Sequence, residues 1–560
     1  MRATMQALPR PLAWLLPAAA VLLMAHSGVA HGEPEMEFEP DDLGDEVSDP
    51  ADEPADEPRP EPPADTSPPS ETLERATSMY DEGRYFPASI ELHRVIAGQT
   101  DDSEANLHRA EFFLGKTLYH LGFYASALSQ FDDIVELGYG HRYFPATLPW
   151  LAALSRVLPE SSGVLDLIGA YDPSDLEDPI MDDVRDELYY LLGRHAYEQG
   201  DFTAAIDLFR RVSEQDPFHL RAKFFEAVTH VRQFDGEPAV EAFQDLLVLN
   251  EEEPDHFDRS QIRRFGELAR LQLARIFYST QQFDTSIRYY EELPQDSPDW
   301  LDAVFEASWA HFMRGQNSHA LGNIHTLTAP YFEDQFYPES IILRSVIFYN
   351  YCLYDRALES VEEFNAIYMP LREEVEQVLE EHPDDADLFD FVLDLRNGNS
   401  GLPEETASLL RSAVDDRRAQ TAFQWVVEIE DELERLQAAD DGWADTDVGG
   451  EVLGELTFNE SFARAEAGGL ARERLERLED QLREHGSDAL RVRIEVLEAL
   501  AGEISADARD EQITGDHEPE PIDVDDEHVM WNFDGEYWRD ELGHYRYRIR
   551  SECPGEGRLQ

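Results

Sequence analysis

The stretch DELYYLLGRHAYEQGDFTAAIDLFRRVSEQDPFH, residues 186–219, carries the pattern that decides the fold. Its apolar residues recur at helical spacing on both sides of Gly200, which can end a helix in the left-handed conformation at little cost. Gly193 and Ala205 are small enough to let two antiparallel helices approach closely. Pro217 ends the second helix, because proline cannot continue one. The stretch therefore predicts a helix–turn–helix unit.

The same pattern recurs along the chain, and recurrence at a near-constant period indicates a repeat architecture. Further matching units lie at 70–103, 108–141, 220–253, 267–300, 301–334 and 338–370. A small residue marks the second helix of each unit, at Ala88, Ala127, Ala205, Ala239, Ser286, Ala320 and Ala357. The interval between Ala127 and Ala205 is about two units long, so we expect a degenerate unit within 142–185.

This pattern resembles the tetratricopeptide repeat, a helix–turn–helix unit of about 34 residues. The resemblance covers residues 71–370, about seven to eight units. It implies an all-α fold, a right-handed superhelical α-solenoid in which each pair buries its apolar face against its neighbours. It also implies that the first helices of the units line a concave groove.

The repeat phase of this family places particular positions of each first helix in the groove. Mapping that phase onto the sequence predicts a partner-binding groove that is rich in cations and aromatic rings. These residue types supply much of the binding energy at protein interfaces, and arginine also forms two-pronged contacts with carboxylates. The predicted groove residues are Arg109, Phe112, Lys116, Tyr119, Tyr190, Arg194, Tyr197, Arg221, Phe224, Arg275 and Tyr278, with His120 and Arg232 in the same phase.

Three interpretations of the predicted groove remain open. The groove binds an extended acidic or aromatic peptide of a partner, or its arginines neutralise acidic residues of the solenoid itself, or the chain's own acidic segments occupy it. Chaperone-binding members of the family clamp a terminal carboxylate with basic residues and asparagines. The asparagines are missing at the matching positions, so that activity is not carried over.

Charge and cysteine content exclude several classes of protein. The chain has 119 acidic and 45 basic residues and a net charge of −74, so it repels nucleic-acid backbones. Its two cysteines, Cys352 and Cys553, exclude a disulfide scaffold and a four-cysteine zinc site. Their spacing does not imply that they pair. Cys352 stands where a repeat usually has the glycine of the inter-helix turn.

The amino terminus has the pattern of an export signal. Residues 1–30 contain Arg2 and Arg10, an apolar run from Leu12 to Met24, and small residues ending at Ala30. This is typical of a cleaved signal peptide, because the apolar run is shorter than the roughly 20 residues that span a bilayer. Residues 31–70, rich in proline and acid, then read as a disordered tether. We expect a periplasmic, outer-envelope-associated or secreted protein without a later transmembrane helix.

The helices continue beyond the repeats. Residues 371–505 read as a helical extension with an antiparallel hairpin or short coiled coil, its long helices at about 403–436 and 468–504. The hairpin either packs on the repeats or serves as an oligomerisation arm. An acidic linker follows at 506–527.

The last segment, 528–560, is aromatic and basic. Alternation of tyrosine with arginine predicts a β-like strand. The segment is similar to the carboxyl-terminal ends of large envelope tetratricopeptide-repeat proteins of gram-negative bacteria, some of which belong to gliding-motility machines. It either docks to an envelope partner or lies on the chain's own acidic helices. The predicted docking residues are Trp538, Tyr545, Arg546, Tyr547 and Arg548.

No catalytic motif stands out. The sequence has no zinc-protease motif, no phosphate-binding glycine loop and no nucleophile elbow, and we expect no catalytic residue, cofactor or metal. The main hypothesis is a non-catalytic scaffold or adaptor of the bacterial cell envelope that binds proteins or peptides, not nucleic acid. The alternatives are a component of a surface-motility or secretion machine and a substrate-presenting subunit of an envelope enzyme.

Overall fold

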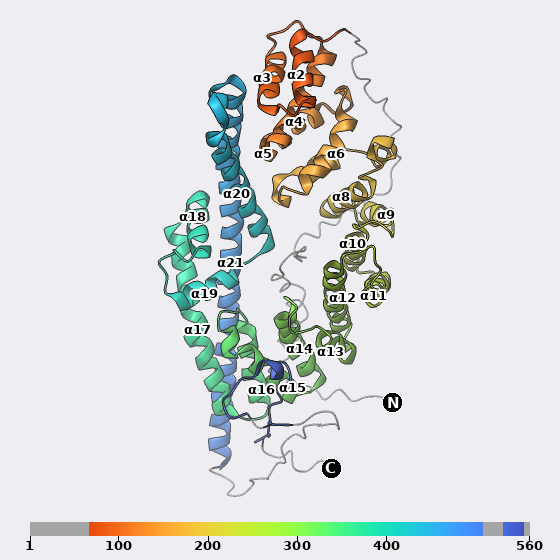
Figure 1. The fold of residues 1–560 in the computed structure, drawn as a ribbon. Helices are drawn as coiled ribbons and strands as arrows, with labels where there is room; N and C mark the ends of the chain where they lie inside the picture. Colours follow the sequence, from red (N-terminus) through yellow and green to blue (C-terminus); the bar gives the residue numbers. More distant parts are fainter. Residues whose placement is uncertain (1–66, 508–529, 532, 554–560) are drawn as a thin grey trace, which may run out of the picture. The chain divides into compact units, whose positions relative to one another are not determined.

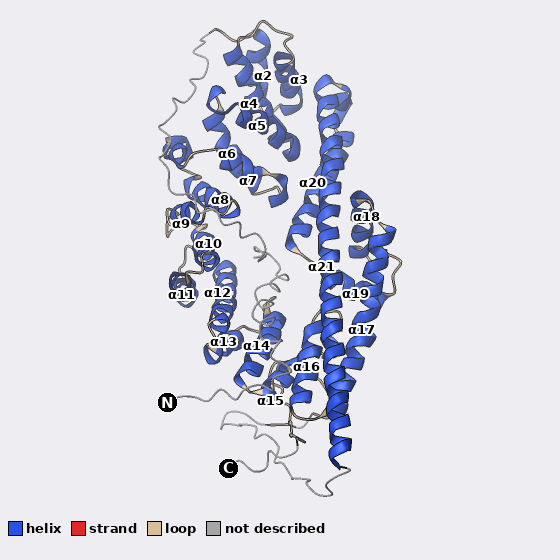
Figure 2. Ribbon diagram, turned by 180° about the vertical axis from the view of Figure 1, so that it is seen from behind, coloured by secondary structure: helices blue, strands red, loops and turns tan. Residues whose placement is uncertain are grey.

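The computed structural model describes residues 67–507, 530–531 and 533–553 of the chain. These residues form helices and connecting loops, and no strand occurs among them (Figure 2). The all-α prediction is confirmed. The predicted signal peptide, almost all of the tether and most of the acidic linker lie outside the described residues.

The chain forms two compact units (Figure 1). The N-terminal unit contains residues 67–265 and 418–469, and the C-terminal unit contains 266–417 and the described residues from 470 onward. Two helices, α12 (Arg259–Ser279) and α21 (Asp447–Asp507), contribute residues to both units.

Helix pairs make up most of the N-terminal unit, and α20 and the start of α21 follow them in the chain. Pro149 lies inside α6, and two 3-10 helices, η4 (Pro173–Glu177) and η5 (Pro179–Met181), follow α7, which accounts for the degenerate pattern of 142–185. The helices are α2 (Glu71–Asp81), α3 (Tyr85–Ile96), α4 (Glu104–Leu121), α5 (Tyr124–Leu137), α6 (Phe144–Ser155), α7 (Val164–Gly169), α8 (Arg185–Glu198), α9 (Phe202–Phe209), α10 (His219–Arg232), α11 (Gly236–Glu252) and α20 (Arg417–Ala438).

The C-terminal unit continues the pairs and then extends into longer helices. Its helices are α13 (Phe283–Glu291), α14 (Trp300–Arg314), α15 (Asn317–Leu327), α16 (Pro338–Asn350), α17 (Tyr354–Glu381), α18 (Asp385–Arg396) and α19 (Glu404–Ala413). Helix α17 runs past Pro370, where the last repeat was expected to end.

A residue in the left-handed conformation stands at the turn between the two helices of most pairs. Glycine fills this position four times, because it adopts positive φ without a steric penalty. Other residues fill it three times, and Cys352 is one of them, with φ 58°. The residues are Gly83, Gly122, Gly200, Phe234, Gln281, Gly315 and Cys352.

Close packing within the pairs depends on small residues, as the sequence predicts. All seven small residues that mark the second helices are fully buried, with 0 % exposure. At Gly193 the ring of Phe209 lies 2.6 Å from where a Cβ would stand, and Phe131 lies equally close to Gly115. Such contacts leave no room for a side chain, so the helix separation is set by glycine.

The long-helix boundaries differ from the prediction. The helix expected over 403–436 is divided into α19 and α20, because the chain turns at 414–416. Side chains of α21 hold this turn: Arg474 Nε donates to the Ala413 carbonyl at 2.9 Å, and Arg477 pairs with Asp416 at 3.1 Å. Helix α21 begins at Asp447, well before the expected residue 468.

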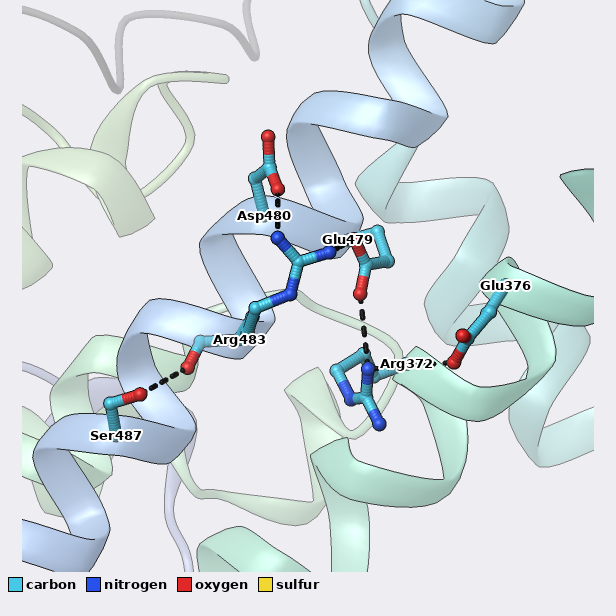
Figure 3. Close-up of polar contacts among 6 residues, drawn as sticks. All are labelled: Arg372, Glu376, Glu479, Asp480, Arg483 and Ser487. Carbon is cyan, nitrogen blue, oxygen red and sulfur yellow. Dashed lines mark hydrogen bonds and ion pairs between the residues drawn. The ribbon is translucent and has the colours of Figure 1, made fainter.

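Helix α21 packs along α17 in the C-terminal unit, and Figure 3 shows their polar contacts. Arg372 of α17 pairs with Glu479 of α21 at 3.0 Å, and Glu479 also pairs with Arg483. On the same helix, side chains at three- and four-residue steps are buried: Leu475, Leu478, Leu482, Val492 and Val496. The extension therefore packs within the chain.

In the N-terminal unit, the α20–α21 hairpin covers the second helices of the first repeats. Trp443, in the connection η7 (Asp440–Asp445), is buried, and its Nε1 donates to Ser89 Oγ of α3 at 3.0 Å. Its ring stacks on Phe123 with centroids 5.4 Å apart. Trp443 therefore anchors the connection between α20 and α21 on the first repeats.

Candidate protein-binding surface

The first helices of the first three pairs, α2, α4 and α6, contribute neighbouring aromatic rings around one lysine. The Lys116 ammonium of α4 lies 4.6 Å from the ring centroids of Tyr80 and Phe113 and 5.2 Å from that of Trp150. We call these four residues the Lys116 cluster. A cation over the face of an aromatic ring is stabilised by the quadrupole of the ring.

No ion pair compensates Lys116 within the part of the chain that the structure describes. Burial lowers the pKa of Lys116, and the more distant charge of Asp81 partly opposes that shift. In a chain with 119 acidic residues, an ammonium that is surrounded by rings rather than carboxylates is unusual. Its geometry suits an incoming anionic or aromatic group.

Aromatic residues extend the surface beyond the cluster. His120 is exposed, its ring stacks on Tyr85 at 4.8 Å, and its Nε2 lies 3.1 Å from the Tyr80 hydroxyl. Tyr119 is partly exposed and meets Trp150 edge to face at 5.4 Å. The predicted groove residues Lys116 and Tyr119 thus lie on one aromatic surface.

Arg194 has a different environment. It is 7 % exposed, and its guanidinium pairs with Glu160 at 3.1 Å and Glu198 at 3.2 Å. It also donates to the Tyr190 hydroxyl and lies 4.3 Å from the ring centroid of Phe225. Arg194 therefore neutralises acidic residues of the solenoid itself, which is the second of the three interpretations given above.

Arg275 is likewise buried, and it forms a two-pronged ion pair with Glu306 of α14. Its Nη2 lies 2.7 Å from one carboxylate oxygen, and its Nε donates to the same carboxylate at 3.0 Å. Tyr290 donates to Glu306 at 2.8 Å. This network is part of the core of the C-terminal unit.

The other predicted groove residues are likewise either buried or partly exposed. Phe112, Tyr190, Phe224 and Tyr278 are buried, and Phe112 stacks on Tyr143 with centroids 4.8 Å apart. The partly exposed ones are Arg109, Tyr197 and Arg221. Each takes part in a cation–ring contact: Arg109 lies over Phe113, Arg221 lies over Phe218, and the ring of Tyr197 lies beneath Arg232. Partner contact at these positions stays a prediction.

One group in the N-terminal unit has the composition of a metal site. His108, Glu111 and His141 offer ligand atoms that all lie within 4.8 Å of one another. Each imidazole, however, accepts a backbone N–H on Nδ1, His108 from Arg142 at 3.3 Å and His141 from Tyr143 at 3.1 Å. A neutral imidazole that accepts on Nδ1 carries its proton on Nε2, the atom that a metal would need. The arrangement favours a hydrogen-bonded group over a metal centre.

The repeat geometry agrees with a family comparison. Residues 190–254 match the family model described as "Tetratricopeptide repeat". Residues 190–254 of the chain thus contain tetratricopeptide repeats. Tetratricopeptide repeats are generally a non-catalytic fold that binds other proteins on extended surfaces.

Solved structures of tetratricopeptide-repeat proteins are among those that resemble the chain. A tetratricopeptide repeat protein from Parabacteroides merdae ATCC 43184 is 16% identical, with 53% of this chain and 91% of that chain covered and a TM-score of 0.22. The apo form of RapI is 13% identical, with coverages of 61% and 96% and a TM-score of 0.33. No curated protein matches the sequence.

The carboxyl-terminal segment lies on the chain's own C-terminal unit. It is extended but forms no strand in its described residues, which corrects the β-like prediction. It lies along α15, because Tyr547 exchanges two hydrogen bonds with Ser318, rather than on the acidic helices. Trp538 and Arg548 are exposed, whereas Tyr545, Arg546 and Tyr547 are partly buried.

The repeat phase missed three members of the Lys116 cluster. Phe113 follows the predicted Phe112 by one residue, and one residue is about 100° around a helix, so a small error in phase exchanges a buried for an exposed position. Trp150 lies in the degenerate unit, where no phase could be assigned. Tyr80 lies in the first unit, 70–103, in which no groove residue was predicted.

Among the described residues, no helix is both long and apolar enough to cross a bilayer.

Proposed function

We propose that this tetratricopeptide-repeat protein is a non-catalytic scaffold of the bacterial cell envelope that binds segments of partner proteins on the first-helix surface around Lys116. The observation that carries the proposal is the Lys116 cluster, a cation beside the rings of Tyr80, Phe113 and Trp150 and also near that of Phe112, with no ion pair to any described residue. Aromatic residues and cations dominate the binding energy of protein interfaces. The partner segment is expected to carry a carboxylate or an aromatic side chain.

Two features support the envelope as its location. The first 30 residues have the pattern of a signal peptide. Cys352 and Cys553 form a disulfide in the structure, and such bonds persist in oxidising compartments outside the cytosol. A role in surface motility or secretion is one specific form of this function, and loss of surface translocation with normal growth in a deletion strain would identify it.

The proposed surface is tested by crosslinking in intact cells. A photoreactive residue replaces the exposed His120 beside the cluster, and a second protein carries it at Phe234, which is 79% exposed at the α10–α11 turn. We expect His120 to capture a defined partner and Phe234 not to capture it. Equal capture at both positions would argue against the surface.

Substitutions at Lys116 separate charge from packing. Lys116→Met keeps the length of the side chain but removes the ammonium, so we expect capture from His120 to fall at least fivefold. Lys116→Arg keeps a cation over the rings and retains capture. Far-UV circular dichroism shows whether each variant is folded. Unchanged capture by a folded Lys116→Met protein would refute the role of the cation.

A further inference from the structure

The carboxyl-terminal segment is bound to the C-terminal unit like a peptide ligand. We call residues 537–553 the C-terminal strap. Ser318 of α15 and Tyr547 of the strap exchange two hydrogen bonds, from Ser318 Oγ to the Tyr547 carbonyl at 2.7 Å and from the Tyr547 N–H to the Ser318 carbonyl at 3.0 Å. One turn further along α15, the surface approaches the strap closely enough to exclude any side chain.

That close approach occurs at Gly322. A Cβ added at this glycine would overlap the carbonyl oxygen of Tyr545. Four residues later, Thr326 Oγ1 accepts the N–H of Gly543 at 2.9 Å. Ser318, Gly322 and Thr326 are spaced four residues apart and share one face of α15. This face is therefore shaped for an extended backbone.

Neighbouring elements complete the binding surface. Gln295 donates to the Leu542 carbonyl at 2.8 Å, and the N–H of Glu552 donates to the Tyr351 carbonyl at 2.9 Å. Backbone groups of Leu542, Gly543, Tyr547 and Glu552 thus form hydrogen bonds with the surface, as those of bound extended peptides do.

Apolar and aromatic side chains anchor the strap. Leu542 is 5% exposed and Ile549 is 1% exposed. The rings of Tyr537 and Tyr545 lie 5.0 and 4.9 Å from that of His325. Burial of these two aliphatic side chains favours the bound position of the strap, because it removes apolar surface from water.

A disulfide bond joins the end of the strap to the C-terminal unit. Cys352, at the α16–α17 turn, is bonded to Cys553 at the end of the strap, across a sequence separation of 201 residues. These are the only two cysteines of the chain. The disulfide holds the strap on α15 at a high effective concentration, so a competing peptide has to displace a tethered ligand.

We propose that the Ser318–Thr326 face of α15 is a peptide-binding site, that the strap is its ligand in cis, and that the Cys352–Cys553 disulfide controls exchange. The peptides that fit are extended segments with a glycine followed by alternating aromatic and basic residues, as in Gly543–Ile549. A dithiol donates two electrons and two protons to the disulfide, which gives two thiols, and is itself oxidised to a disulfide. The reduced strap then exchanges with a peptide supplied in trans.

The test uses the full-length protein and a fluorescent synthetic peptide with the sequence of residues 537–552, which lacks cysteine. Anisotropy is measured with oxidised protein, with protein reduced by dithiothreitol, and with the Cys553→Ser variant without reductant. We expect at least tenfold tighter binding to the reduced protein and to Cys553→Ser than to the oxidised protein. Equal binding to oxidised and reduced protein would overturn the proposal.

Substitution of glycine provides the site-specific control. Gly322→Ala places a methyl group against the strap backbone, so the peptide should not bind even after reduction. Gly454→Ala, at an exposed helical glycine of α21 with open space around it, should leave peptide binding unchanged. Hydrogen exchange of the strap amides gives a second readout: protection lost on reduction supports exchange, and full protection after reduction contradicts it. The same experiment shows that α15 of Gly322→Ala is folded.

Discussion

The carboxylate of Glu432 accepts a hydrogen bond from the backbone N–H of Ala125 at 2.5 Å, across 307 residues of sequence. It also accepts from Ser126 Oγ at 3.4 Å. Helix α5 begins here and has no capping side chain of its own at Phe123. The first N–H groups of a helix need acceptors, and a carboxyl oxygen of Glu432 supplies one. Helix α20 therefore caps a helix of the second repeat.

Removal of this long-range cap is expected to destabilise the N-terminal unit. Glu432→Ala leaves buried N–H groups without an acceptor, which costs about 1–3 kcal/mol. Glu432→Gln keeps an acceptor oxygen and should cost less. Chemical denaturation of both variants measures the difference. Equal stability of Glu432→Ala and the wild type would mean that the cap contributes nothing.

The pH dependence of the same residue has a definite sign. Burial raises the pKa of Glu432 to about 8 from 4.5, although the N–H groups of Ala125 and Ser126 oppose the shift. The folded state therefore holds a proton that the unfolded state releases, and stability falls as the pH rises from about 4.5 to about 8. The stability of Glu432→Gln relative to that of the wild type should therefore rise as the pH increases over this range. The control is Glu434→Gln, an exposed position on the same helix, which should show no such trend.

Close helix packing makes a second prediction. Gly193→Ala should destabilise the repeat by about 1–3 kcal/mol, because the new methyl group meets the ring of Phe209. Alanine is otherwise the better helix former by about 1 kcal/mol. Gly454→Ala, which meets no atom within 4 Å, should therefore be neutral or stabilising. Thermal unfolding of the two variants compares them directly, and an equal effect at both positions would contradict the packing argument.

The buried ion pair makes a third prediction. Arg275→Met leaves Glu306 buried and uncompensated, which should cost about 3–5 kcal/mol. The double variant Arg275→Met/Glu306→Gln removes the stranded charge and should recover a large part of that loss. A double-mutant cycle by chemical denaturation measures the coupling. Arg314→Met, at an exposed pair with Asp284, serves as the surface control and should leave stability nearly unchanged.

The inter-helix turns make a fourth prediction. Gln281 has φ 61° at the turn between α12 and α13, where other repeats have glycine. Gln281→Gly should relieve the left-handed strain and stabilise the turn by up to about 1 kcal/mol. Its neighbour Gln282 has φ −91°, so Gln282→Gly relieves nothing and adds disorder to the unfolded state. Stabilisation by both substitutions, measured by thermal unfolding, would show that backbone strain is not the cause.

The repeats could be predicted from the sequence because they depend on local physical requirements. Small residues at the close approach of two helices and a left-handed residue at the turn are needed whatever surrounds the pair, so Gly193, Gly200 and Ala205 predict the unit by themselves. Boundaries in the extension were less predictable. Helix α21 passes through Gly449 and Gly450, which suggest a loop in isolation, and an added Cβ at Gly449 would overlap the Trp443 carbonyl.

The candidate surface could be predicted only in part. Repeat phase led to Lys116 and Tyr119, which lie on the aromatic surface, and also to Arg194 and Arg275, which are buried ion-pair partners. An arginine in a groove and an arginine in a core have the same periodicity. The carboxylates that distinguish them, Glu160 and Glu306, come from neighbouring helices.

The sequence by itself determined the helix pairs and most of their turns, because helix packing and backbone conformation are local constraints that each repeat must satisfy. Only the tertiary structure decided which predicted groove cations form ion pairs, that Glu432 caps α5, and that Cys352 is bonded to Cys553. These relationships join segments that are far apart along the chain. Their energies depend on burial and on distances between side chains, which no periodicity records.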